Sequence, residues 1–543
     1  MRKHYLWMLA AILICGTTMT LTSCSGDNAI GDKTTPTPKT EYKIEVEEGM
    51  TLPDNDFLKV PAVAGDQNII KALKAIDKVT DVKAFKMEAY MDYYNNKMVT
   101  KTAYFFNFKQ PVDHNNPSKG WYKQQCVLTV AGQDRPTVLH TEGYALNNDK
   151  NKLQEMFEPM LVSVLEANCL QVEHRYHGWS LPEGYTNKWT YLNAKQQSDD
   201  LHAIVTAIKK SGVLGKNSKW IATGVSKGGE TTAYYAYHYP NEIDAYVPFC
   251  APLLTTLKDE RPYSYILSVQ AFNDKQENLD KVKNAFRTYI SDKNLQAECV
   301  EVYRKKKPEY ASSLYEDLRI SLLTNLFVNH FPRMSYVAYK RWEDMIPKAG
   351  DSAEKFYNFI MSNEKTKYPG ETEEQYNRRK DYLDFDTDGS ATSMSRAFTR
   401  TQTVTRHDPY YVQACKELGN YIIMFDWADD LLTAEEKSKI QNDENPDAYG
   451  VTYDNGKFEK EVLEGLKQST CNMMFVYGSQ DPWTGGQIPD DKLGVNSQKL
   501  IVVNPSDSPT EAGLHNDFID QWNALEKAQL FKWLNQLGFL PNE

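Results

Sequence analysis

Ser226 lies in the stretch 221-IATGVSKGGETTAYYAY-237, between an apolar run and a segment with helical periodicity. The pattern Gly-x-Ser-x-Gly is typical of a sharp strand-to-helix turn that exposes a serine hydroxyl. A serine hydroxyl is a weak nucleophile at neutral pH, so it needs a histidine to take its proton and a carboxylate to orient that histidine. Because an ordinary glycine-rich connection would show the same short pattern, the rest of the chain must supply the two partners.

Two residues late in the chain fit these partner roles. Asp481 closes the apolar run 473-MMFVYGSQD-481, and His515 lies in 511-EAGLHNDF-518, past a second apolar run. In hydrolases that use this turn, the serine, the acid and the histidine follow in that chain order, with the last two in loops after later strands. His515 is the only one of the 10 histidines that follows Asp481. Alone, they would be a turn former and a surface histidine, but their joint order and placement predict a triad with Ser226.

Backbone N–H groups must stabilise the oxyanion that forms when the serine attacks a carbonyl. The N–H of Lys227 follows the nucleophile at the start of a predicted helix, whose dipole favours negative charge. A second donor is expected in the loop 139-LHTEGYAL-146, where the N–H of Gly143 or Tyr144 is the candidate, since glycine permits close backbone approach. We expect the Lys227 side chain to be packed or solvated rather than to act as a base.

Strands and helices alternate over much of the chain. Short apolar strands are predicted at 103–110, 124–132, 136–143, 169–176, 219–225, 244–252, 473–481 and 498–505. Helical periods are found at 68–79, 150–167, 191–211, 227–240 and 518–538. Buried strands separated by helices predict the α/β class, with a largely parallel sheet and helices on both of its faces.

The chain of 543 residues is too long for one compact core. The simplest organisation is an α/β domain interrupted by a charged, aromatic-rich segment of helical period. The expected parts are a signal peptide (1–23), a polar tether (24–42), a first core part (43–255), a helical cap insertion (256–466) and a second core part (467–543).

The N-terminus has the layout of a secretory signal, with basic residues before an apolar segment and then 21-LTSC-24. This ending resembles a bacterial lipobox, which implies cleavage before Cys24 and lipid attachment to its thiol. We therefore expect an exported, membrane-anchored lipoprotein at the periplasmic face or cell surface, which contacts the membrane through the lipid alone. A plain signal peptide with an incidental Cys24 is the alternative.

The composition narrows the possible partners. The formal net charge is −11, and no long Lys/Arg-rich block is present, which argues against a nucleic-acid partner. No Cys-x-x-Cys pair, phosphate-binding loop, dinucleotide fingerprint or His-Glu-x-x-His motif occurs, so neither a metal nor a cofactor is predicted. The oligomeric state cannot be derived from these features.

Further segments carry a family resemblance, namely 108-FKQPVDHNNP-117, 173-EHRYHGWSLP-182, 191-YLNAKQQSDDL-201 and 478-GSQDPWTGG-486. Together with the serine motif, they resemble exported serine exopeptidases related to prolyl carboxypeptidase and dipeptidyl peptidase II. The lysine after the serine resembles the bacterial secreted tripeptidyl aminopeptidase branch. Where prolyl carboxypeptidase relatives usually carry an aromatic residue this chain has Lys227, so strict proline specificity does not follow.

The resemblance implies an α/β-hydrolase fold with a helical cap and a Ser226–Asp481–His515 triad. The implied substrates are oligopeptides, cut near the N-terminus to release two or three residues, without a cofactor. Such an enzyme must hold a free ammonium, for which Glu142 is the candidate and Glu230 the second choice, although either could be a surface charge. An esterase with the same machinery and a non-catalytic surface-tethered binding lipoprotein are the alternative functions.

Overall fold

The computed structural model of the chain describes residues 61–87, 90–92, 94–143, 146, 158–178, 180–181, 189–216, 218–272, 274–329, 346–361, 408–440, 446–503 and 518–540. The predicted signal peptide and tether, with the lipid-anchor candidate Cys24, lie outside these residues. So do Tyr144 and His515.

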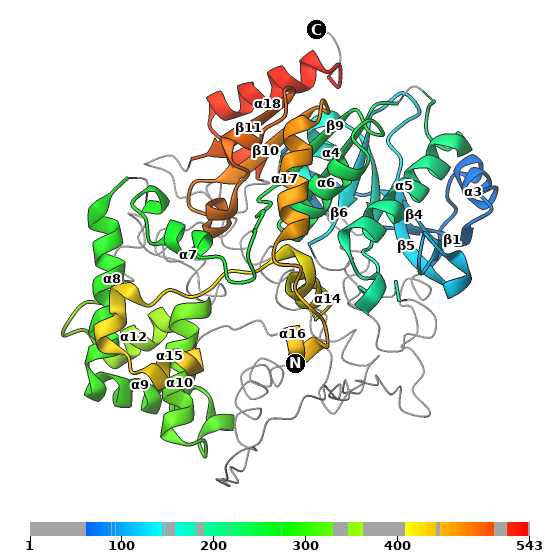
Figure 1. Cartoon of the computed structure of the whole chain (residues 1–543). Coiled ribbons are helices and arrows are strands. Elements are labelled where there is room, and N and C mark those ends of the chain that lie inside the picture. The colour runs from blue at the N-terminus through cyan, green and yellow to red at the C-terminus, as the bar shows by residue number, and fades with distance from the viewer. Residues whose placement is uncertain are drawn as a thin grey trace, which may run out of the picture.

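A nine-stranded sheet forms the centre of the molecule (Figure 1), with the strand order β1-β4-β5-β7-β6-β8-β9-β10-β11. The strands are β1 (Val79–Lys86), β4 (Thr102–Pro111), β5 (Trp121–Thr129), β6 (Thr137–Thr141), β7 (Asn168–Val172), β8 (Trp220–Val225), β9 (Ala245–Phe249), β10 (Met473–Gly478) and β11 (Ser497–Val502). A separate two-stranded sheet joins β2 (Tyr90–Asp92) to β3 (Lys97–Val99). The apolar runs identified in the sequence all correspond to strands, whereas β1, β2 and β3 were not predicted.

The sheet is antiparallel at one end and parallel over the rest. Strands β1, β4, β5 and β7 pair antiparallel in that order. From β7 through β6, β8, β9 and β10 to β11 every pairing is parallel. All residues of β6 and β9 are buried, as expected for strands covered on both faces. The mostly parallel sheet in this strand order is that of an α/β-hydrolase fold, as predicted.

Helices cover both faces of the sheet, as expected. On one face, α3 (Gln67–Lys74), α5 (Ala194–Ser211), α6 (Lys227–His238) and α17 (Lys457–Gln468) share an apolar cluster with the strands. On the other face, α4 (Met160–Leu165) and α18 (Ala524–Gln536) bury Leu165 and Trp533 in a second cluster. The chain goes from β6 to β7 on one side and then crosses back to β8 on the other side of β6. Open α/β sheets place their ligand-binding and active sites at such a change in strand order.

Between β9 and β10, the described residues form helices and one isolated bridge, Asp259–Tyr421. Besides α17, which packs against the sheet, the α-helices are α7 (Arg261–Ile266), α8 (Gln276–Ser291), α9 (Lys293–Lys306), α10 (Tyr315–Thr324), α12 (Ala353–Ile360), α14 (Asp408–Gln413), α15 (Ala434–Ile440) and α16 (Pro446–Tyr449). Helices α8, α9, α10, α12 and α15 gather beside the sheet-containing part (Figure 1). They enclose an apolar cluster of their own, which includes Phe286 and Phe327. The numerical domain boundaries stay predictions.

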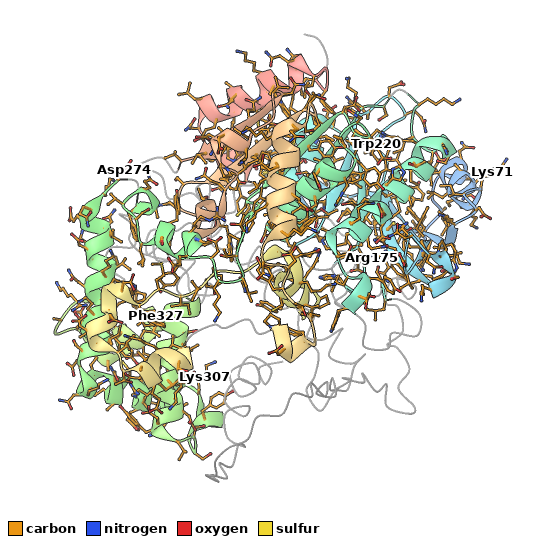
Figure 2. All side chains as sticks on the ribbon, viewed as in Figure 1. Lys71, Arg175, Trp220, Asp274, Lys307 and Phe327 are labelled. Carbon is orange, nitrogen blue, oxygen red and sulfur yellow. The ribbon has the colours of Figure 1, made fainter. Side chains whose placement is uncertain are left out.

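A buried ion pair joins the connection after β7 to α5. The Arg175 guanidinium donates to Asp200 through Nε at 2.7 Å and Nη2 at 2.8 Å, and both side chains are fully buried. Tyr122 Oη and His114 Nε2 reach the same carboxylate at 2.8 and 2.7 Å. Burial alone would raise the pKa of Asp200, but the Arg175 charge and the hydrogen bonds hold this pKa below its usual value. Figure 2 shows Arg175 in the sheet-containing part, away from Phe327 among the cap helices.

The sequence predicts a strand over 169–176, but this range is too long at its end. Strand β7 ends at Val172, so Glu173 and Arg175 lie in the connection that follows. Arg175 also donates through Nη1 to the carbonyl of Val112 at 2.9 Å, which ties this connection to the end of β4. The pair therefore fixes the backbone just beyond the carboxyl end of β7.

Replacing Arg175 with Met should lower the free energy of unfolding by about 3–5 kcal/mol, because the Asp200 carboxylate would stay buried without its charged partner. The matched control is Arg287→Met, since Arg287 binds Asp430 in the same two-pronged way but on the surface. This control should leave unfolding nearly unchanged, because exposed pairs add little. Urea titrations followed by circular dichroism measure both variants, and equal shifts would contradict the structural role of the buried pair.

Candidate active site

Ser226 occupies a sharp turn between β8 and α6. Its backbone dihedrals are φ 56° and ψ −122°, a conformation that residues with a side chain rarely adopt. The Ser226 N–H donates to the carbonyl of Phe249 at 3.0 Å, which holds the turn against the end of β9. The residue is half-buried. The predicted strand-to-helix turn is therefore present, and it presents the serine at the carboxyl end of the sheet.

The glycines of the motif are required by close backbone packing. A Cβ on Gly228 would lie 2.2 Å from the carbonyl oxygen of Thr141, and one on Gly224 would lie 2.6 Å from the same oxygen. A Cβ on Gly229 would lie 2.3 Å from the carbonyl oxygen of Phe249. Since these are main-chain atoms of the neighbouring strands, any larger residue would force the helix away from the sheet.

The loop after β6 lies beside this turn. The Cβ position of Gly143 is 3.8 Å from the carbonyl oxygen of Val225, the residue before the serine. Within the part of the chain that the structure describes, neither Gly143 N–H nor Lys227 N–H donates a hydrogen bond to another protein group. Two candidate oxyanion donors thus lie at or beside the serine turn, on backbone that the glycine contacts hold in place.

Asp481 follows the end of β10, and its side chain is fully buried. One carboxylate oxygen accepts the N–H of Trp483 at 2.9 Å, and the other contacts the thiol of Cys250. Because Phe249 accepts the Ser226 N–H, residues 249 and 250 connect the serine turn to the acid. No sequence signal distinguishes Cys250, whose contact depends on the pairing of β9 with β10. His515 lies outside the described residues, so the triad stays a prediction.

The Lys227 side chain is buried, with 2% of its surface exposed. Its Nζ donates to Thr231 Oγ1 at 3.5 Å. Burial lowers the pKa of the Lys227 ammonium and raises the pKa of the nearby Glu230 carboxyl, while the attraction between the two groups opposes both shifts. Glu230 is itself 2% exposed, so it is not the surface charge that its polarity alone would suggest.

Glu142 lies between Thr141 and the candidate donor Gly143. Its side chain is 15% exposed, and its carboxylate lies 3.8 Å from His140 Nδ1, beyond hydrogen-bond distance. The carboxylate is therefore largely shielded from solvent and retains capacity to accept hydrogen bonds.

Among the described residues, no group of three or more His, Cys, Asp or Glu side chains could hold a metal ion. None of the helices in the same residues is long and apolar enough to cross a membrane. The six cysteines that the structure describes are all buried, and none of them forms a disulfide with another.

The profile of the family described as PS-10 peptidase S37 matches residues 72–301. The prolyl tri/tetrapeptidyl aminopeptidase of Streptomyces mobaraensis is 26% identical over 427 residues, which cover 75% of this chain and 74% of that protein. Prolyl carboxy peptidase like protein 5 of Caenorhabditis elegans is 22% identical over 414 residues, or 69% of this chain and 78% of that protein. A solved proline iminopeptidase structure from Mycobacterium smegmatis matches with 10% identity and a TM-score of 0.33, covering 79% of this chain and 98% of that one.

Replacing Lys227 with Met removes the ammonium and keeps the backbone N–H. We expect kcat for a peptide substrate to stay within a few-fold of its original value, because the buried side chain packs inside the fold and does not transfer a proton. Steady-state kinetics over a range of pH values measures the effect. A loss of about 100-fold or more, as when a general acid or base is removed, would contradict this assignment.

Proposed function

We propose that this chain, which belongs to the peptidase S37 (PS-10) family of serine peptidases, removes short peptides of two or three residues from the N-termini of oligopeptides. The observation that carries the proposal is the strained turn at Ser226, beside backbone N–H groups of Gly143 and Lys227 that donate to no other group among the described residues. A half-buried serine in this setting is suited to acyl transfer.

In the proposed mechanism, Ser226 Oγ attacks the scissile carbonyl carbon while His515 takes the hydroxyl proton. Asp481 holds the histidine in the required tautomer and stabilises its charged form. The backbone N–H groups of Lys227 and Gly143 stabilise the oxyanion, and Tyr144 is the alternative to Gly143. His515 then gives its proton to the leaving amine, and water hydrolyses the acyl-enzyme by the same route. These steps require no cofactor.

The proposed specificity for chain ends needs a group that binds the substrate ammonium. We assign this role to Glu142, because the residue directly precedes the candidate donor Gly143 and its side chain is only 15% exposed. Two or three extended residues span up to about 7–10 Å, which sets the distance from the scissile carbonyl to the ammonium. The similarity to the prolyl tri/tetrapeptidyl aminopeptidase of Streptomyces mobaraensis supports the proposal that short peptides are released from N-termini. The helices between β9 and β10 would limit entry to the site so that only the ends of peptide substrates reach Ser226.

We also propose that the mature protein is exported and is anchored to the membrane through a lipid on Cys24. The lipobox-like 21-LTSC-24 supports this proposal. Replacing Cys24 with Ala should move the protein from the membrane fraction to the soluble fraction of the cells that express it, as detected by immunoblot. A membrane fraction that keeps the variant protein would contradict the lipid anchor.

The direct test of the function is digestion of a peptide library that contains each peptide with a free and with an acetylated N-terminus. We expect di- or tripeptides to be released from the free peptides alone, because acetylation removes the ammonium that Glu142 would bind. Mass spectrometry of the products measures this, and Glu142→Gln should lose most of the preference.

Three other outcomes have definite meanings in this test. Equal cleavage of acetylated peptides would refute the aminopeptidase assignment. Hydrolysis of short-chain esters without peptide cleavage would favour an esterase. The Ser226→Ala variant should be inactive on all substrates, and undiminished peptide hydrolysis by this variant would refute the serine mechanism.

A further inference from the structure

The first three residues after β7 each form a hydrogen bond or an ion pair with a different residue. The Glu173 carboxylate accepts the N–H of Leu146 at 2.8 Å. The next residue, His174, has its Nε2 2.5 Å from the carbonyl oxygen of Glu142. Arg175 makes the buried pair with Asp200. The segment 173-EHR-175 therefore holds the loop after β6 at its start, at residue 142, and further along, at residue 146, while its own position is fixed by the ion pair.

The contact between His174 and Glu142 acts on one particular peptide group. The carbonyl of Glu142 and the N–H of Gly143 belong to the same planar unit, and in a trans peptide they point in opposite directions. A hydrogen bond that fixes the carbonyl therefore fixes the direction of the N–H. The carbonyl of Glu142 is held on the His174 side, so the N–H of Gly143 must point away from it.

The hydrogen bond also defines the protonation of His174. A carbonyl oxygen can only accept, so Nε2 must carry the proton that it donates. The residue is 4% exposed, and the charged or titratable groups near it are Lys227 on α6, His177 in the same connection and His140 on β6. Burial first, and then the positive charge of Lys227, hold the pKa of His174 well below its usual range. Near neutral pH His174 is thus a neutral imidazole with a single donor.

We propose that His174 is a positioning residue of the oxyanion hole, which orients the Glu142–Gly143 peptide so that its N–H can stabilise the tetrahedral intermediate. The inference rests on the proposed function, because it concerns the same site. His174 does not touch the reacting atoms. It acts through the peptide group that does, and its loss should affect the transition state more than substrate binding.

The test compares His174→Phe, which keeps a ring but has no donor, with His174→Gln, whose amide N–H can reach a carbonyl. We expect His174→Phe to lower kcat by about 10- to 100-fold with KM nearly unchanged, less than the loss on removing an oxyanion donor outright. His174→Gln should recover part of the rate. His202→Gln is the matched control, because His202 is a half-exposed histidine on α5 that pairs with Glu242, and it should keep the original kcat.

A second measurement separates positioning from loss of folded protein. A peptide aldehyde forms a tetrahedral adduct on the serine whose oxyanion occupies the hole, whereas the corresponding peptide alcohol does not. His174→Phe should weaken inhibition by the aldehyde about tenfold or more and leave inhibition by the alcohol unchanged. Partial unfolding would weaken both inhibitors equally.

The inference is overturned if His174→Phe keeps the original kcat, or if aldehyde and alcohol binding weaken together. These results can be told apart from a failure of the proposed function, because that failure would appear as activity in the Ser226→Ala variant. An inactive Ser226→Ala protein together with a fully active His174→Phe protein would leave the serine mechanism standing and remove only the role of His174.

Discussion

The close approach of three backbone segments at the serine turn is the constraint on which the rest of the structure depends. The carbonyl oxygens of Thr141 and Phe249 occupy the space where side chains at positions 228 and 229 would begin. Only glycine allows α6 to start so near the sheet, and this start places Ser226 in its strained conformation. Such a conformation costs on the order of 1–3 kcal/mol, which the surrounding packing must offset. The same packing keeps the ends of β6 and β9 in contact with the serine turn.

Two further sets of contacts depend on the position of these strand ends. The end of β6 continues into the loop with Glu142 and Gly143, and the end of β9 continues to Cys250, whose thiol contacts the Asp481 carboxylate. The connection after β7 holds the loop that follows β6, through Glu173 and His174. This connection is itself fixed by the ion pair of Arg175 with Asp200. The sequence motifs that accompany the serine motif therefore contain residues that hold the backbone around Ser226 in place.

Sequence reasoning found those parts of the site that depend on local patterns. The turn at Ser226 follows from the spacing of glycines, and the parallel strands follow from short apolar runs, because both signals lie within a few residues. The β1 strand 79-VTDVKAFK-86 was missed, since its antiparallel edge position requires fewer apolar residues. The partner of Arg175 could not be derived either, because Asp200 lies 25 residues away and is brought near by the packing of α5. The contacts of His174 likewise depend on neighbouring strand ends.

The central claim is that Ser226 is the nucleophile, and the most direct measurement locates a covalent adduct on it. The full-length protein is treated with a fluorophosphonate, digested, and analysed by tandem mass spectrometry to identify the modified residue. The account predicts a single modified site, Ser226, whose labelling proceeds in parallel with the loss of peptide hydrolysis. Modification of a different residue together with loss of activity, or full labelling of Ser226 in a protein that still hydrolyses peptides, would contradict it.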